Sequence, residues 1–212
     1  SLAFETHHLG KNGIRQEAAV TLRQITHGGQ PFICAVWRDI TEQKAREREQ
    51  ILHTQRLQIY SQVIRQISAS PAGINGELDL YAQEVTEVLG QLLGIDRISV
   101  WLFPDKENRL DCLDLYEVGR DHHSQGYVLL EEEYRGEFEA LKSARYVDAS
   151  DALTDPRTAG YVEGYLKPTG ITSMLDCAII SGGKNLGTIC FEYVGTPHVW
   201  ATDEIAFGCQ IA

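Results

Sequence analysis

The stretch "ITSMLDCAIISGGKNLGTICFEYVG", residues 171–195, decides the fold. Two apolar runs rich in β-branched residues flank the short segment "SGGK". Paired glycines favour the positive φ angles of a tight turn, and β-branched runs favour extended backbone. The stretch therefore predicts two antiparallel strands joined as a hairpin.

The segment before this hairpin, "DALTDPRTAGYVEGYLKPTG" (residues 151–170), predicts a short helix. Asp155 followed by Pro156 combines a favoured N-cap with a proline in the first turn. The helix is expected to run to about Leu166, where "KPTG" ends it. Within it, Arg157, Tyr161 and Tyr165 are three or four residues apart and can share one face.

Further upstream, residues 57–150 continue the same mixture of helices and strands. "ELDLYAQEVTEVLGQLLG" has apolar residues at helical spacing, and "YRGEFEALKSA" predicts a second, shorter helix. "RISVWLF", "RLDCLDLYEV" and "GYVLL" predict strands, with a turn over residues 104–108. A last helix begins near Thr202. The expected fold class is therefore α+β, a central antiparallel sheet flanked by helices.

The first forty residues predict a separate, smaller sheet. Residues 14–26 and "FICAVWRDI" form an expected antiparallel hairpin around Gly28-Gly29, and an earlier strand ends at an Asn12-Gly13 turn. From Thr41 the chain has no Gly or Pro for almost thirty residues, which predicts a long helical linker.

Four residues of this long helix follow the 3-4-3 spacing of a coiled-coil seam: Leu57, Tyr60, Ile64 and Ile67. Such a seam predicts a homodimer. The same stripe can instead pack on its own domain, and both alternatives stay open.

Composition limits the possible partners and surroundings. Residues 57–212 hold 24 Asp and Glu against 11 Lys and Arg, and the whole chain has a net charge of −11, which disfavours nucleic acid and anionic membranes. There is no membrane-span-length apolar run and no signal peptide. Five scattered cysteines without a Cys-x-x-Cys pair favour buried thiols in a cytoplasmic protein. The start, without Met and within a strand, predicts a piece of a longer protein.

Residues 57–212 resemble a GAF domain, through "DHHSQGYVL", "DALTDPRT", "YLKPTGITSMLD", "GTICFEYVG" and "WATDEIAFGCQIA". Residues 1–48 resemble the C-terminal (PAC) part of a PAS domain, through "VWRDITEQKAREREQ". The expected division is a PAS fragment at 1–40, a helical linker at 41–56 and a GAF domain at 57–212. The resemblance is to the type found in bacterial sensor kinases and diguanylate cyclases. It implies a cytoplasmic signal-input module for an output domain of one of those two kinds.

A GAF resemblance also implies a ligand cavity between the sheet and the short helices. The candidate ligand-binding residues are Asp151, Arg157, Tyr161, Tyr165, Ser173, Cys177 and His122. Alternatively, the two tyrosines only pack on the sheet and Arg157 is solvated. The ligand stays unnamed, because the cyclic-nucleotide signature and the Cys-His dipeptide that often anchors a bilin are absent.

The sequence predicts neither a metal site nor an active site. A metal site in residues 148–176 would need its aspartates to converge, and Asp155 is already a cap. No Ser-His-Asp order, Gly-rich phosphate loop or metalloprotease helix occurs. The main hypothesis is small-molecule sensing coupled to the entry and exit helices. The alternative is a dimerisation spacer without a ligand.

Overall fold

The computed structural model describes residues 1–11, 13–104 and 108–212. The expected turns at Asn12-Gly13 and at residues 104–108 lie partly outside these residues. The chain divides into two compact units, Ser1–Gln58 and Ile59–Ala212. Within the described ranges, no helix is long and apolar enough to span a membrane.

The first unit contains a three-stranded antiparallel sheet in the order β1 (Leu2–Leu9), β2 (Arg15–His27), β3 (Gln30–Asp39). The predicted hairpin of β2 and β3 is confirmed. α1 (Thr41–Ser68) begins directly after β3. Asp39 Oδ1 accepts a hydrogen bond from Thr41 N at 2.9 Å, and Thr41 Oγ1 accepts one from Glu17 N at 2.8 Å. These side-chain oxygens cap α1 and fasten its first turn to β2.

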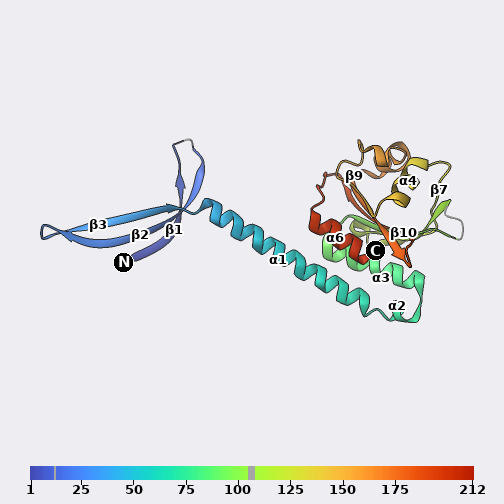
Figure 1. Cartoon of the computed structure of the whole chain (residues 1–212), viewed down its shortest axis with the longest axis horizontal. Coiled ribbons are helices and arrows are strands. Elements are labelled where there is room, and N and C mark those ends of the chain that lie inside the picture. The colour runs from blue at the N-terminus through green and yellow to red at the C-terminus, as the bar shows by residue number, and fades with distance from the viewer. Residues whose placement is uncertain (12, 105–107) are drawn as a thin grey trace. The chain divides into compact units, whose positions relative to one another are not determined.

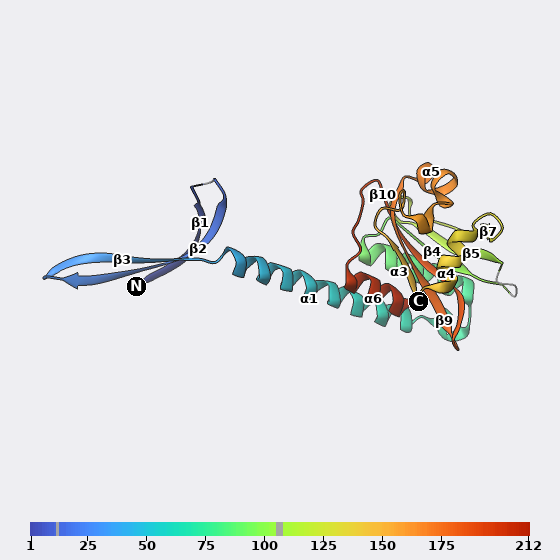
Figure 2. The ribbon, with the colours of Figure 1, turned by 45° about the horizontal axis from the view of Figure 1, so that its top comes forward.

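The second unit has a central antiparallel sheet in the order β6-β5-β4-β10-β9-β8, with β7 paired to β5 (Figure 1 and Figure 2). Its strands are β4 (Arg97–Leu102), β5 (Arg109–Glu117), β6 (His122–Ser124), β7 (Val128–Leu130), β8 (Tyr146–Ala149), β9 (Ile171–Ser181) and β10 (Lys184–Val194). The expected α+β class is confirmed, and the predicted hairpin of β9 and β10 is part of the sheet.

Helices and short turns surround this sheet. The α-helices are α2 (Pro71–Asn75), α3 (Leu78–Leu93), α4 (Arg135–Ser143), α5 (Lys167–Thr169) and α6 (Thr202–Ile211). The others are the 3-10 turns η1 (Val118–Arg120) and η2 (Pro156–Thr158) and the π-helix η3 (Val162–Leu166). The predicted helices at α3, α4 and α6 are present.

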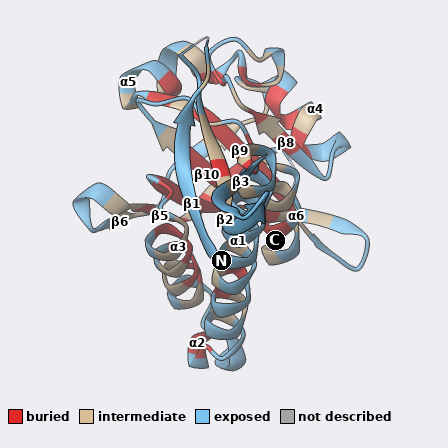
Figure 3. Cartoon of the chain, turned by 90° about the vertical axis from the view of Figure 1, so that its left-hand side faces the viewer, coloured by how far each residue is buried: buried red, intermediate tan, exposed pale blue. Residues whose placement is uncertain are grey.

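One face of the sheet packs against a helical layer and forms the main core. Because side chains alternate along a strand, Leu175 and Cys177 of β9 and Phe191 of β10 all point to this layer. The layer consists of α3, α6 and the C-terminal end of α1. Figure 3 shows the buried positions of these elements in red.

The predicted seam of α1 contributes to this same core. Tyr60 is 9% exposed and stacks on Phe207 of α6 with ring centroids 4.1 Å apart. Ile64 and Ile67 are half-buried against the same cluster, whereas Leu57 is 46% exposed. Three of the four seam residues therefore pack on their own domain, and the homodimer remains a prediction.

The single helix expected from Asp155 to Leu166 is wrong in detail. Asp155 does cap a turn, accepting from Arg157 N at 2.8 Å, but that 3-10 turn ends at Thr158. Thr158 Oγ1 then donates to Ala152 O at 2.8 Å, and the amide of Gly160 donates to Glu137 of α4. These contacts with other segments interrupt the helix, which resumes as the π-helix η3.

Candidate functional site

A cavity of about 440 Å³ lies on the face of the sheet opposite the α3 and α6 layer. Side chains of β4, β5, β9 and β10 form its floor, and η3 and the segments around β7 and α4 form its walls. Five aromatic residues line it: Trp101, Tyr127, Tyr134, Tyr161 and Tyr165. Five ionisable residues also line it, besides Cys190 and these tyrosines: Arg97, Glu117, Arg120, Asp176 and Glu192. Its size falls within the usual range for small-molecule sites.

The aromatic wall is held by contacts between tyrosines. Tyr161 is 6% exposed, and its ring centroid lies 5.2 Å from that of Tyr134 and 6.5 Å from that of Tyr165. Burial raises the pKa of Tyr161 and of Tyr165 well above the ordinary value, so both phenols stay neutral. The two rings give the cavity flat, uncharged surfaces.

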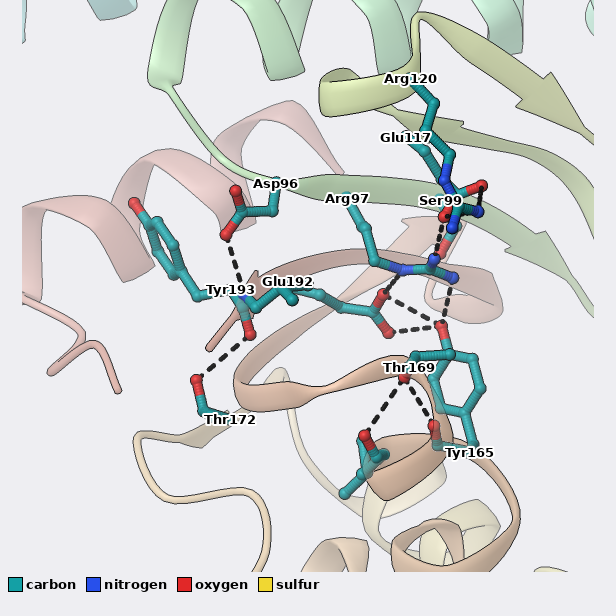
Figure 4. Close-up of polar contacts among 12 residues, drawn as sticks. Asp96, Arg97, Ser99, Glu117, Arg120, Tyr165, Thr169, Thr172, Glu192 and Tyr193 are labelled. Atoms are coloured by element: carbon teal, nitrogen blue, oxygen red, sulfur yellow. Dashed lines mark hydrogen bonds and ion pairs between the residues drawn. The ribbon is translucent and has the colours of Figure 1, made fainter. Parts of the chain in front are cut away.

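A buried ionic network forms part of the cavity lining, and Figure 4 shows its polar contacts. Arg97 Nε donates to Glu192 Oε2 at 3.0 Å, and Arg97 Nη1 donates to Glu117 Oε1 at 2.5 Å. The Tyr165 hydroxyl donates to Glu192 Oε1 at 2.7 Å and accepts from Arg97 Nη2 at 3.4 Å. The network ties β4, β5 and β10 to η3.

Burial controls the charges of this network. Glu192 is 2% exposed, and burial raises the pKa of its carboxyl, while Arg97 and the Tyr165 hydroxyl oppose that rise. Burial alone would lower the pKa of Arg97, but Tyr165 and Glu192 more than offset it, so its pKa is raised. Arg97 is therefore a fixed cation whose charge compensates a carboxylate that is almost completely removed from water.

Asp176 stands apart from this network. It lies on β9, directly across from Cys190 in the neighbouring strand β10, and is 3% exposed. It also lines the cavity. Within the described part of the chain, its Oδ1 atom has no hydrogen-bond partner. Burial raises the pKa of Asp176 to about 7, the charge of Glu192 adds to the rise, and the Cys190 thiol opposes it. Asp176 is thus a carboxyl group whose charge is poorly compensated in this structure.

The structure brings together two of the seven candidate residues, since Tyr161 and Tyr165 both line the cavity. Arg157 binds Asp155 Oδ2 at 2.7 Å and Asp148 Oδ1 at 3.0 Å instead. Asp151 accepts from Thr154 Oγ1 at 2.8 Å and shapes a turn. The interrupted helix is the reason: η2 and η3 do not present Arg157 and the tyrosines on one face.

The other three candidates also lie away from the cavity lining. Ser173 is fully buried, donating to Ser150 O at 2.7 Å and accepting from His198 N at 2.8 Å. Cys177 points to the helical layer, with its Sγ 3.9 Å from Sγ of Cys209. His122 is an exposed residue at the start of β6.

Sequence reasoning missed Arg97, Asp176 and Glu192 as cavity residues. The signal was present, because each is a charged residue within an apolar strand run, directly next to a core position and therefore on the opposite face of the sheet. In β9, Asp176 lies between Leu175 and Cys177, and both of those face the helices. Alternation alone therefore assigns the acid to the opposite face, where the cavity lies.

Comparison with known proteins agrees with this architecture. A family model described as "GAF domain" matches residues 77–212. The GAF domain of a phosphoenolpyruvate-protein phosphotransferase from Coxiella burnetii is similar, with 19% identity, a TM-score of 0.56, and coverage of 73% of this chain and 86% of that one. No curated protein sequence gave a significant match.

Two other GAF domains are also similar in structure. The phycocyanobilin-bound GAF domain of a cyanobacterial phytochrome has 17% identity and a TM-score of 0.58, covering 72% of this chain and 88% of that one. The GAF domain of PixJ from Thermosynechococcus elongatus has 16% identity and a TM-score of 0.55, covering 68% and 84%. At these identities the likeness concerns the fold. Since the family model spans well over half of the sequence, the chain belongs to the GAF domain family.

Proposed function

We propose that this chain is a signal-input module in which a small molecule binds in the cavity and changes the packing of α1 and α6. The observation that carries the proposal is the cavity of about 440 Å³, lined by aromatic and ionisable side chains on one face of the sheet. A similar GAF domain holds phycocyanobilin and another similar structure holds biliverdin IXa, which supports a ligand-binding role for the fold. The bound molecule in this chain is not assigned to either chemistry.

The strands provide a direct connection from the cavity to the helices. Asp176 of β9 faces the cavity, while its neighbours Leu175 and Cys177 face α6. Gly208 of α6 lies so close to β9 that an added Cβ would be 2.8 Å from Cys177 Sγ. A small displacement of β9 by a ligand would therefore be felt by α6. A ligand changes this packing only if it binds one arrangement better than the other.

The wider context is part of the same proposal. We place the module in the cytoplasm, in a longer signalling protein with a histidine kinase or diguanylate cyclase output domain. Residues 1–40 would be the end of a PAS domain and residues 41–56 a helical linker to the GAF domain. Support comes from the antiparallel sheet of β1, β2 and β3, and from the hydrogen bonds of Asp39 and Thr41 where α1 begins.

A cavity-filling variant tests the binding site. Gly164 lines the cavity in η3, and a Cβ there would meet no atom within 4 Å, so G164W is expected to occupy the cavity without unfolding the domain. Native mass spectrometry with a panel of metabolites should show a bound mass on the unmodified chain. G164W should lose that mass, because the indole takes the space of the ligand.

Gly136 supplies the matched control. It lies in α4, outside the cavity lining, and a Cβ there also meets no atom within 4 Å. G136W should keep the bound mass. If G164W binds the same metabolite as tightly as the unmodified chain, the cavity is not the binding site.

A second function, dimerisation through α1, is supported by its exposed apolar residues. Leu57 is 46% exposed, and Ile51 and Leu52 are 56% and 59% exposed. We expect L57E to lower the dimer fraction in analytical ultracentrifugation with no change in melting temperature, because Leu57 contributes little to its own core. Q58E, at the neighbouring exposed position, adds the same charge and should stay dimeric. Dimers of L57E as stable as those of the unmodified chain would reject this seam.

A further inference from the structure

Asp176 is the unusual group of the cavity. The residue is 3% exposed, and its Oδ1 has no hydrogen-bond partner among the residues that the structure describes. A buried acceptor without a partner is costly, and most such groups in native proteins are paired with protein, water or a ligand. Because Asp176 lines the cavity, a molecule bound there lies beside this carboxyl group. That molecule needs a hydrogen-bond donor.

The charged residues of the lining favour one sign of charge on the ligand. Among the residues that the structure describes, its carboxylates are Glu117, Asp176 and Glu192, against the two guanidinium groups of Arg97 and Arg120. Arg97 is already bonded to Glu117, Glu192 and Tyr165, and the largely exposed Arg120 pairs with Glu117. Of these three acids, Asp176 is the one without a cation among the described residues. A carboxylate or phosphate ligand would add to the negative charge beside it, whereas a cation would neutralise that charge.

The walls decide the shape of the ligand. Tyr134, Tyr161 and Tyr165 form a continuous set of ring contacts, and Trp101 lines the sheet side. Aromatic faces bind flat rings and also attract cations. A flat molecule with one charged end therefore matches both the walls and Asp176.

We propose that the cavity binds a small aromatic cation whose N–H groups donate to Oδ1 of Asp176 and whose ring lies among the tyrosines. This proposal rests on the proposed function and names the ligand class of the same cavity. The pKa of Asp176, raised to about 7 by burial, agrees with it, because a bound cation would favour the ionised carboxyl.

The test uses three probes of one shape: benzamidine, a cation with N–H donors; benzamide, its neutral analogue; and benzoate, its anionic analogue. Binding is followed through the three indole N–H signals in proton–nitrogen correlation spectra of the full chain. Trp101 lines the cavity, Trp37 lies in the first unit, and Trp200 packs in the helical core. Probe concentrations extend to about 10 mM, since ligands of this size bind weakly.

We expect benzamidine to shift the Trp101 signal and to bind at least about tenfold more tightly than benzamide or benzoate. D176N should remove that preference by weakening benzamidine about tenfold, while E133Q, at an exposed acid outside the cavity, should leave it unchanged. The ranking of the three probes on the unmodified chain does not depend on any variant folding.

Two results would overturn the proposal, and they differ in what they say about function. If benzoate binds best and shifts Trp101, the cavity is a ligand site for anions, so the ligand class is wrong and the proposed function stands. If none of the probes shifts Trp101, the cationic-ligand proposal fails. The metabolite panel with G164W then decides separately whether the cavity binds any small molecule.

Discussion

Replacing Arg97 by methionine is expected to lower the free energy of unfolding by about 3–5 kcal/mol at pH 8. The substitution removes the cation that Glu192 faces, and Glu192 is only 2% exposed. A buried carboxylate without a partner must either keep an uncompensated charge or take up a proton. Because burial already raises the pKa of Glu192, the loss should become smaller as the pH falls and protonation removes the charge.

Urea unfolding of three variants separates this explanation from a general loss of packing. The double variant R97M/E192Q removes both charges and should recover most of the lost stability. R120M removes a guanidinium whose side chain is 75% exposed and should change stability by no more than about 1 kcal/mol. If R97M and R97M/E192Q are equally unstable, the cost does not come from the buried carboxylate.

Replacing Asp176 by asparagine is expected to stabilise the ligand-free domain, by an amount that grows with pH. The pKa of Asp176 is about 7 in the folded chain, whereas an ordinary aspartate has a pKa of 3.8. At pH values between these two, the folded chain keeps a proton that the unfolded chain releases. The contribution of Asp176 to stability therefore decreases as pH rises from about 4 to about 7. Asparagine does not titrate, so D176N avoids this loss.

The measurement compares unfolding free energies of D176N and the unmodified chain at pH 5 and pH 8. The pKa of Asp176 lies about two pH units above 5, which corresponds to about 2–3 kcal/mol. From pH 5 to pH 8, the unfolding free energy of D176N should therefore rise by about that amount relative to the unmodified chain. The neighbouring residues Cys190 and Glu192 are present in both proteins, so their own contributions to the unfolding free energy largely cancel in the difference. A difference that does not change with pH would mean that Asp176 titrates as an ordinary exposed acid.

Most of the fold could be predicted because its signals are local. The "SGGK" turn between two β-branched runs specifies the β9–β10 hairpin, and the apolar spacing of α3 specifies a helix with one buried face. The helix after Asp155 could not be predicted as observed. Its interruption depends on Glu137 of α4, which accepts from Gly160 N across 23 residues of sequence.

The site was harder to predict than the fold for a related reason. Tyr161 and Tyr165 could be predicted as a pair from their helical spacing, and both line the cavity. Arg97 and Glu192 are 95 residues apart, so their pairing depends on the register of β4 and β10 and not on any local motif. Cys177 was assigned to the site, but the strand alternation that places Asp176 in the cavity places Cys177 against α6.

Amide hydrogen exchange in α6, measured with and without a bound ligand, tests whether binding in the cavity changes the packing of this helix. The ligand is the metabolite found by mass spectrometry, or benzamidine. α6 packs on the face of the sheet opposite the cavity, so a ligand does not shield it directly. We expect binding to change exchange in Thr202–Ile211 by about fivefold or more, which is the lower end of typical coupling between sites. Changes confined to η3 and the cavity strands would contradict it, because the cavity would then bind without signalling.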